Sequence, residues 1–326
     1  RDGDASSRSA ATAYLAALRD DIVLERLRSA FVPITVATDI GPVDGLDAVS
    51  ACGRCALVGP PGCGKTTLLR ASVGSIAEAA GAVPGALPVP VYVDLAEARP
   101  GDGADEVVAR VLVAAAPRPL GAPELSPSSL FLDNLDRVTD VYLLEGLELL
   151  LRAGGRAGPN VVLACRDAEW PALSAWFRDV PVMRVRPLAP TAVRQALRLQ
   201  LPEAVAAAVE AWLALDGPLA RAAQSPKTLM ALCDAVRDRP PAEWRRAHVL
   251  DALLEAVLSG LAGSERKAYR AALSDVALDS LGQGAMVEVD TVAMGLGVTR
   301  DAMIRTGAVV ARGSALEFVE PLLAQH

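Results

Sequence analysis

The sequence predicts an α/β fold with a parallel five-stranded sheet, followed by a helical domain and a winged-helix domain. Three observations support this prediction. Short apolar runs alternate with helical patterns up to about residue 188, which is typical of a parallel sheet with helices on both faces. A glycine-rich loop follows the first buried run. Beyond residue 190 the strand-like runs almost vanish, until two short runs around an Arg-Gly-Ser turn predict a hairpin.

The first half of the chain supplies the expected sheet. Apolar residues at helical spacing predict a helix over residues 9–29, and an extended stretch follows over residues 31–36. Glycine, proline and aspartate predict a loop over residues 39–47. The predicted strands lie at 55–58, 89–94, 129–133, 160–166 and 182–186, and the helices between them at about 65–80, 105–116 and 138–152. Ligands of such sheets bind at the carboxyl ends of the strands.

The second half is predicted to be mostly helical. Helices are expected at about 190–201, 203–215, 226–237, 243–261 and 265–281, and the hairpin at 308–319. Chain breaks near residues 186–190 and 239–241 suggest two domain boundaries. We therefore expect an N-terminal helix and extended segment at 1–50, the sheet domain at 51–188, a helical lid domain at 189–240 and a winged-helix domain at 241–326.

Composition and charge narrow the functional classes. The 326 residues give room for two or three domains. The net charge of −7 argues against a protein that binds nucleic acid with its whole surface, although it leaves a local basic patch open. The sequence shows no secretory signal and no apolar run of membrane-spanning length. Five cysteines, an odd number, favour a reducing compartment, so we expect a cytoplasmic protein, and the first residue, Arg1, suggests a piece of a longer one.

The strongest motif follows the first predicted strand. Gly59, Gly64, Lys65 and Thr66 fit the pattern G-x-x-x-x-G-K-[ST] of a phosphate-binding loop, or P-loop. The backbone N–H groups of such a loop surround phosphate oxygens, and the positive end of the next helix faces them. We expect Lys65 to reach the β- and γ-phosphates and the Thr66 hydroxyl to ligate Mg²⁺. The alternative is a glycine–proline turn that only joins a core strand to a helix. The residues expected to contact a nucleotide are Gly59, Pro60, Pro61, Gly62, Cys63, Gly64, Lys65, Thr66 and Thr67.

An acidic motif ends the third predicted strand. Asp133 follows the apolar run and Asp136 lies three residues further on. A carboxylate at this strand end holds Mg²⁺ directly or through water, so Asp133 is assigned as a metal ligand together with Thr66. Asp136 is placed to orient or deprotonate the attacking water. Lys65, Asp133 and Asp136 are therefore candidate catalytic residues. The alternative is that both acids merely start a turn.

Arg166 ends the fourth predicted strand. In the ASCE class of P-loop proteins the strands lie in the order 5-1-4-3-2, and the fourth strand carries a polar sensor beside the γ-phosphate. If this sheet follows that order, the Arg166 guanidinium is placed to bind phosphate oxygens, and it joins the candidate catalytic set. The alternative is a surface ion pair with Asp167 or Glu169.

A C-x-x-C pair, Cys52 and Cys55, precedes the loop. As half of a zinc site it lacks a second cysteine pair, because only His248 and His326 remain as further ligands of this kind. As a redox motif it would be expected to open a helix, whereas here it enters a strand. We therefore interpret it as part of the core strand.

Taken together, these motifs resemble the NACHT branch of the STAND signalling NTPases. The glycine loop, the acidic motif and the run Val161–Arg166 occur in that family's order, and the resemblance covers most of the chain. The segment Ser225–Cys233 is similar to the family's N-P-x-x-L-x-x-L-C helix start, which implies that Pro226 packs near the nucleotide base. The segment Leu316–Ala324 is similar to the end of the family's winged helix.

The chain also departs from the family's pattern. Asn134 stands where the family has a small residue, and Arg137 stands in place of a third acid. Glu320 stands where a winged-helix histidine touches the β-phosphate of bound diphosphate in some members, and a carboxylate there repels phosphate unless it faces away or pairs with an arginine. Pro226 is equally explained as the first-turn proline of a helix that Ser225 caps.

We therefore expect a nucleoside triphosphatase that acts as a nucleotide-dependent switch in signalling or defence. The implied cofactors are ATP or ADP, with GTP as an alternative, and Mg²⁺, and slow hydrolysis resets the switch. The triphosphate state is expected to form a homo-oligomer and to activate an effector outside this segment, without nucleic acid. Two other interpretations stay open: an AAA+-type DNA loader or motor, and a degenerate NTPase that holds nucleotide as a structural element.

Overall fold

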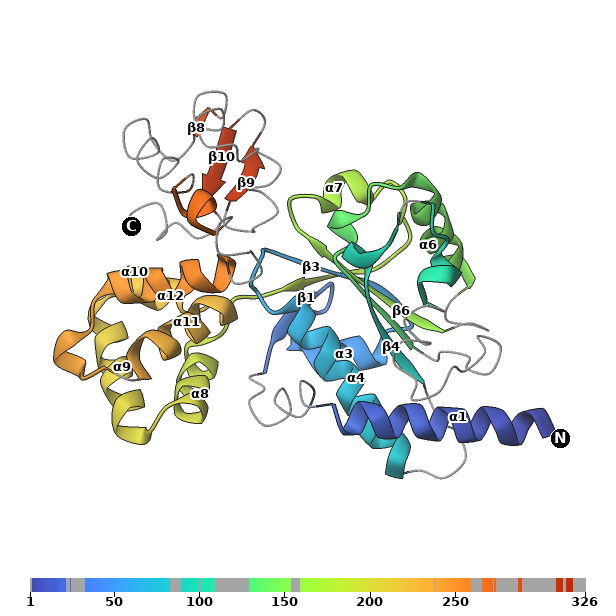
Figure 1. Cartoon of the computed structure of the whole chain (residues 1–326), viewed down its shortest axis with the longest axis horizontal. Coiled ribbons are helices and arrows are strands. Elements are labelled where there is room, and N and C mark those ends of the chain that lie inside the picture. Colours follow the sequence, from blue (N-terminus) through green and yellow to red (C-terminus); the bar gives the residue numbers. More distant parts are fainter. Residues whose placement is uncertain are drawn as a thin grey trace. The chain divides into compact units, whose positions relative to one another are not determined.

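The structure is a computed structural model (Figure 1). It describes residues 2–21, 24, 33–82, 89–99, 101–108, 129–153, 159–237, 239–258, 266–271, 273, 287–288, 309–312 and 315–318. The chain divides into two compact units, Arg1–Pro187 and Leu188–His326, and each unit is described by itself. Within the described residues no helix combines the length and the apolar character that crossing a membrane requires.

The first unit is built on a seven-stranded sheet in the order β2-β1-β7-β3-β6-β5-β4. Its strands are β1 (Thr35–Thr38), β2 (Gly41–Asp44), β3 (Arg54–Gly59), β4 (Pro90–Asp94), β5 (Ser129–Asp133), β6 (Asn160–Arg166) and β7 (Val182–Val185). The five strands predicted from the sequence are parallel neighbours in the order β7-β3-β6-β5-β4, which is the expected order. The predicted strand number is wrong, because β1 and β2 extend the sheet in antiparallel pairing beyond β7.

The loop predicted over residues 39–47 contains regular structure. It is a hairpin turn, strand β2 and the start of helix α3 (Gly45–Ala51). Thr38 pairs with Gly41 across the two-residue turn, and Gly41, which directly follows the turn, has a positive φ of 121° that residues with a Cβ rarely adopt. The carboxylate of Asp44 accepts hydrogen bonds from N–H groups of the first turn of α3. The glycine, proline and aspartate residues that indicated a loop therefore form a tight turn and a helix cap.

Helices cover both faces of the sheet. Among the described residues of the first unit, helices with defined bounds are α1 (Asp2–Arg19), α3, α4 (Lys65–Ala82), α6 (Val141–Ala153) and α7 (Trp170–Leu173). Alternate side chains of β3 enter two different hydrophobic clusters. Cys55 and Leu57 belong to the first cluster, and Ala56 and Val58 belong to the second. Buried residues of α3 and α4 complete the first cluster, and those of α6 and α7 the second, on opposite sides of the sheet (Figure 1). This double burial explains why the parallel strands are continuous apolar runs in the sequence.

Two predicted helices of the first unit have different bounds. The helix expected at 9–29 begins earlier, as α1 from Asp2, and α1 ends at Arg19. Leu24 is helical again, and residues 22–23 and 25–29 lie outside the described residues. Tyr14 anchors α1, because its hydroxyl donates a 2.9 Å hydrogen bond to the carbonyl oxygen of Pro90. Residues 104–108 are helical, and the rest of the helix expected at 105–116 lies outside the described residues.

The second unit is mostly helical, as the sequence predicts. Its helices are α8 (Pro190–Gln200), α9 (Glu203–Leu215), α10 (Gly217–Ala222), α11 (Pro226–Arg237) and α12 (Arg246–Leu258). The short α10 was not expected, and its N-terminus is capped by Asp216, which accepts a 3.0 Å hydrogen bond from the N–H of Leu219. Residues 266–271 are helical within the helix expected at 265–281, whose last residues lie outside the described part of the chain.

A small antiparallel sheet lies in the C-terminal part, in the order β8-β10-β9. Strands β9 (Val309–Arg312) and β10 (Ala315–Phe318) form the predicted hairpin, with Arg312 paired to Ala315 across the turn. The third strand, β8 (Val287–Glu288), pairs with β10 and was not predicted. Because most residues between 259 and 326 lie outside the described part of the chain, the winged-helix domain stays a prediction. Glu320 is among the residues outside it.

Candidate phosphate- and metal-binding site

The P-loop connects the end of β3 to the start of α4. Gly62 and Gly64 have φ angles of 75° and 101°, a conformation that residues with a Cβ rarely adopt. Gly59 is favoured for a different reason, because a Cβ built there would lie 2.9 Å from the sulfur of Cys63 and 3.2 Å from Cβ of Val185. The glycines of the motif thus set the backbone path of the loop. The N–H groups of the first turn of α4 lie at the end of this path, where a helix favours anions.

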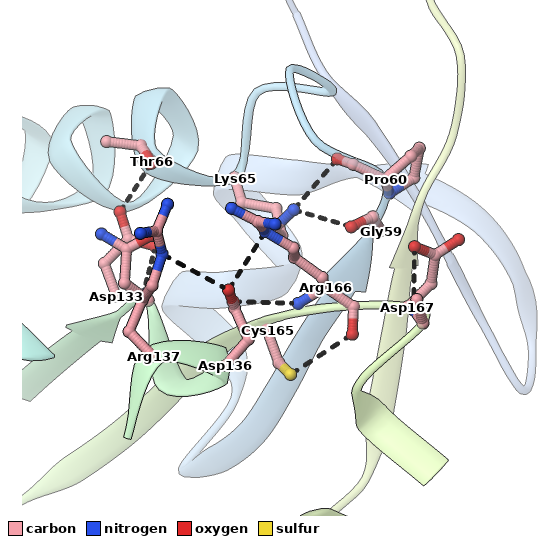
Figure 2. A network of polar contacts seen from close by, with 12 residues as sticks. Gly59, Pro60, Lys65, Thr66, Asp133, Asp136, Arg137, Cys165, Arg166 and Asp167 are labelled. Atoms are coloured by element: carbon pink, nitrogen blue, oxygen red, sulfur yellow. Dashed lines mark hydrogen bonds and ion pairs between the residues drawn. The ribbon is translucent and has the colours of Figure 1, made fainter. Parts of the chain in front are cut away.

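Lys65 is the first residue of α4, and its side chain folds back over the loop (Figure 2). Its ammonium group donates hydrogen bonds to the carbonyl oxygens of Gly59, at 2.7 Å, and Pro60, at 3.0 Å. It also lies 3.9 Å from the sulfur of Cys63. A flexible cation is therefore held beside the backbone of the loop by contacts with neutral groups. Phosphate oxygens are stronger acceptors, because hydrogen bonds between ionised groups are stronger than those to neutral partners.

Thr66 contacts the end of strand β5. Its hydroxyl donates a 2.6 Å hydrogen bond to Oδ2 of Asp133, a carboxylate that is only 1% exposed (Figure 2). Oδ1 of Asp133 accepts a 2.9 Å hydrogen bond from the N–H of Asn134. The two residues that the sequence assigned to a metal thus lie together, one from the helix after the loop and one from the carboxyl end of a central strand.

Tyr92 of β4 is a third partner of this carboxylate, and it was missed at the sequence level. Its hydroxyl donates a 2.9 Å hydrogen bond to the same Oδ2 of Asp133 that accepts from Thr66. The Arg70 guanidinium lies 4.8 Å from the centre of the Tyr92 ring, in a cation–π contact. Burial, followed by the charge of Asp133, raises the pKa of Tyr92, so the phenol stays protonated and donates. The available signal was a tyrosine inside an otherwise apolar strand that neighbours the carboxylate strand.

Asn134 explains one departure from the family's pattern. Its backbone is left-handed, with a φ of 59°, and among the described residues it is the one non-glycine with a positive φ. Glycine adopts this conformation readily, and asparagine is the next best choice. The Asn134 side chain also donates a 2.8 Å hydrogen bond to Oδ1 of Asp94, at the end of β4. The turn after Asp133 is thereby fastened to the neighbouring strand.

Asp136 and Arg166 form a largely buried ion pair at the ends of β5 and β6 (Figure 2). Nε of Arg166 lies 3.1 Å from Oδ2 of Asp136, and their side chains are 12% and 4% exposed. The backbone N–H of Arg166 donates a 3.3 Å hydrogen bond to Oδ1 of the same aspartate. Arg137 lies at 4.0 Å from Oδ2, on the more exposed side. The surface pair with Asp167 or Glu169, left open as an alternative, is thus not the contact that this arginine makes.

Glu169 lies close to this pair. Burial raises its pKa, and the charge of Arg166 opposes that effect. Its Oε2 is buried and makes no hydrogen bond with the described residues. Cys165, beside Arg166 on β6, is buried, and burial raises the pKa of its thiol to about 12. The end of β6 therefore carries an arginine held by acids, and its neighbouring thiol is unreactive.

The residues at this edge of the sheet suit a Mg²⁺ ion that shares its ligands with phosphate, rather than a metal ion that is held by protein side chains alone. The hydroxyl of Thr66 and the carboxylate of Asp133 are oxygen ligands of the kind that Mg²⁺ prefers. Within the described part of the chain, no group of three or more His, Cys, Asp or Glu side chains gathers where an ion would bind. Mg²⁺ is commonly held by one or two protein oxygens together with phosphate oxygens, and this donor set fits that pattern.

Pro226 belongs to the second unit. It is the first residue of α11, and the N–H of Leu229 bonds to the carbonyl oxygen of Ser225 at 2.9 Å. The position of Pro226 in the first turn of a helix therefore explains the proline without any contact to a nucleotide. Its proposed contact with a nucleotide base stays a prediction.

Comparisons with known proteins find distant similarities among solved structures. No protein-family model and no curated protein matches the sequence. A mutant RuvB from Thermotoga maritima is 14% identical, with a TM-score of 0.46 over 86% of this chain and 90% of that one. The ORC1 protein of Aeropyrum pernix, in complex with DNA, is 18% identical, with a TM-score of 0.42 over 95% and 90%.

A third solved structure is a signal transduction ATPase with numerous domains (STAND), which carries a tetratricopeptide repeat sensor and comes from Pyrococcus horikoshii. It is 14% identical, with a TM-score of 0.32, over 86% of this chain and 41% of its own. At these identities and TM-scores the similarities carry no information about the function of this chain.

Proposed function

We propose that this chain is a nucleotide-dependent molecular switch, which binds a nucleoside triphosphate with Mg²⁺ and hydrolyses it slowly. The observation that carries the proposal is the contact between the Thr66 hydroxyl and the buried carboxylate of Asp133. It joins the two motifs that define a metal–triphosphate site, beside a loop whose glycines have the backbone angles that phosphate binding requires.

Each residue has a role in this proposal. The loop from Gly59 to Thr67 binds the β-phosphate through its backbone N–H groups, and Lys65 exchanges its carbonyl partners for phosphate oxygens. Thr66 and Asp133 hold Mg²⁺, which supplies positive charge to the phosphate oxygens. The Asp133 carboxylate is kept in place for this by its hydrogen bond from Tyr92.

Arg166 and Asp136 act as a unit. Both carboxylate oxygens of Asp136 are engaged by Arg166, so the aspartate fixes the position of the guanidinium at the carboxyl end of β6. A fixed guanidinium there is suited to distinguish a triphosphate from a diphosphate by its charge. Asp136 orients the attacking water only when its hold on Arg166 relaxes, and this agrees with slow hydrolysis.

The switching role follows from the resemblance to NACHT-type NTPases. In this proposal the helical and winged-helix segments differ in their contacts with the diphosphate and triphosphate states, so the nucleotide shifts a two-state equilibrium. The triphosphate state forms a homo-oligomer that activates an effector beyond this segment. ATP is preferred to GTP in the proposal, and no nucleic acid takes part, in agreement with the net charge of −7.

Light scattering coupled to gel filtration tests this proposal on the purified chain. The protein is compared with Mg·ATP, with Mg·ADP and without nucleotide, beside Lys65→Ala in the same three conditions. We expect a larger assembly with Mg·ATP alone, absent from Lys65→Ala. An identical mass in all three conditions contradicts the switch. ATP-dependent binding to a DNA duplex that weakens steeply with salt indicates the AAA+-type loader instead.

A further inference from the structure

One buried carboxylate oxygen near the carboxyl end of β6 has no role in the site described so far. Glu169 is the last residue of the turn, residues 167–169, that joins β6 to α7. Its Oε2 atom is buried and makes no hydrogen bond with the described residues. Helix capping does not explain this side chain, because Glu169 stands at the N-cap position of α7 and its side chain makes no capping hydrogen bond. Its carbonyl oxygen, by contrast, accepts from the N–H groups of Ala172 and Leu173.

A carboxylate oxygen in this position is costly. Removing it from water without a hydrogen-bond donor destabilises the folded protein, so each such group calls for a reason. Burial accordingly raises the pKa of Glu169, and the charge of Arg166 acts in the opposite direction. The carboxylate therefore has a cation nearby, although its inner oxygen is not bonded to that cation in this structure.

Arg166 is within reach of Glu169. Arg166 ends β6, and Glu169 lies three residues further on in the turn, a spacing at which the Cα atoms of a tight turn lie within about 7 Å of each other. Asp136 approaches the guanidinium at Nε, which lies 3.1 Å from Oδ2. Nε is the guanidinium donor nearest the main chain, and the two terminal nitrogens extend beyond it. Rotation about the side-chain bonds of Arg166 can therefore direct a terminal nitrogen at Glu169.

The two carboxylates compete for this one guanidinium. The negative charge of Asp136 raises the pKa of Glu169, as a like charge does at short range. Arg137 lies 4.0 Å from the same Oδ2 of Asp136 that Arg166 approaches, so the aspartate keeps a cation beside it when Arg166 turns away. A move of Arg166 to Glu169 therefore leaves neither carboxylate without a positive partner.

We propose that Glu169 is the second partner of Arg166 and takes over its guanidinium when a triphosphate is bound. Oδ2 of Asp136 is then released to orient the attacking water. Glu169 acts through Arg166 and does not touch the nucleotide, so it is a positioning residue. This inference rests on the proposed nucleoside triphosphatase, and it identifies the step that makes turnover slow, because hydrolysis waits until Arg166 has changed partners.

Unfolding in urea without nucleotide tests the change of partner. Asp136→Asn removes the charge that holds Arg166, so Arg166 should turn to Glu169 in that variant. Adding Glu169→Gln to Asp136→Asn should then lower the unfolding midpoint further. Adding it to a variant that carries both Asp136→Asn and Arg166→Met should not, because the guanidinium is gone. An equal effect of Glu169→Gln in the two backgrounds overturns the proposal.

Turnover of the single variant Glu169→Gln, which keeps the shape of the side chain, tests the consequence. With Mg·ATP we expect kcat to fall about tenfold at unchanged KM, because the release of Asp136 is impaired and nucleotide binding is not. Glu145→Gln, at an exposed position of α6, is the matched control and should behave like the wild-type protein. An unchanged kcat in Glu169→Gln overturns the proposal, and so does a loss of ATP binding in a folded variant.

The two tests separate this inference from the proposed function. A wild-type chain that neither binds nor hydrolyses a nucleoside triphosphate refutes the proposed function, and the comparison in urea still decides whether Glu169 is a partner of Arg166. An active wild-type chain with an equally active Glu169→Gln refutes the role of Glu169 alone.

Discussion

The hydroxyl of Thr66 donates a 2.6 Å hydrogen bond to the buried carboxylate of Asp133, across 67 residues of sequence. This contact joins the first turn of α4 to the carboxyl end of β5. It turns two separate sequence motifs into one site. Because the hydroxyl donates its hydrogen, both lone pairs of its oxygen remain available, so that the same oxygen can ligate Mg²⁺ while its O–H still points at Asp133.

Replacing Thr66 by valine removes this hydroxyl at nearly constant volume. We expect Thr66→Val to lower the affinity for Mg·ATP about tenfold, which corresponds to about 1.4 kcal/mol. The affinity for ATP in EDTA should be unchanged, because the loss is confined to the metal. Isothermal titration calorimetry with and without Mg²⁺ measures both values. Thr191→Val, at an exposed position of α8, is the matched control and should behave like the wild-type protein.

Tyr92→Phe removes one hydroxyl from the same carboxylate. Without this donor the orientation of Asp133 is less restricted, so we expect Mg²⁺ to strengthen ATP binding several-fold less than in the wild-type protein. Tyr142→Phe is the control, because that tyrosine is 67% exposed on α6. The ratio of the ATP affinities with and without Mg²⁺ is the deciding quantity. An equal ratio in Tyr92→Phe and the wild-type protein would show that the hydroxyl has no positioning role.

Asn134 tests the backbone geometry after Asp133. Alanine in the left-handed conformation costs about 1–2 kcal/mol, whereas glycine carries no such cost. We therefore expect Asn134→Ala to unfold at lower urea concentration than Asn134→Gly, although both lose the hydrogen bond to Asp94. The difference in the free energy of unfolding between the two variants isolates the cost of placing a residue with a Cβ in the left-handed conformation. Equal unfolding midpoints in urea would contradict the strain argument.

Asp136→Asn tests the buried ion pair with Arg166. Removing one partner of such a pair costs about 3 kcal/mol of folding free energy, so unfolding in urea should shift clearly. Asp234→Asn breaks an exposed pair with Arg237, and its effect should stay below about 1 kcal/mol. We also expect Asp136→Asn to keep ATP binding and to lose about 100-fold in the rate of hydrolysis. Unchanged turnover in a folded variant excludes a catalytic role for Asp136.

Much of the first unit could be predicted from the sequence because its signals are local. The buried strands are continuous apolar runs, and the P-loop pattern is set by the backbone angles of Gly62 and Gly64. The expected strand order also placed Asp133 beside the loop and Arg166 at the end of the strand between them, whereas the ion pair of Arg166 with Asp136 was not predicted. These predictions needed only the direction of parallel strands and the positions at which they end.

The parts that were missed depend on side-chain contacts between distant segments. Tyr92 is an ordinary strand residue until the register of β4 and β5 brings its hydroxyl to Asp133. Strand β2 and the turn before it were predicted as a loop because glycine, proline and aspartate favour turns and caps in any context.

The most direct test of the account is calorimetric titration of the wild-type chain and Lys65→Ala with ATP in the presence of Mg²⁺. Lys267→Ala, at an exposed position of the second unit, serves as the matched control. We predict saturable binding by the wild-type chain and the control, and an affinity at least about tenfold lower for a folded Lys65→Ala. If the folded wild-type chain binds neither ATP, ADP nor GTP, the proposal that this loop is a nucleotide site is wrong.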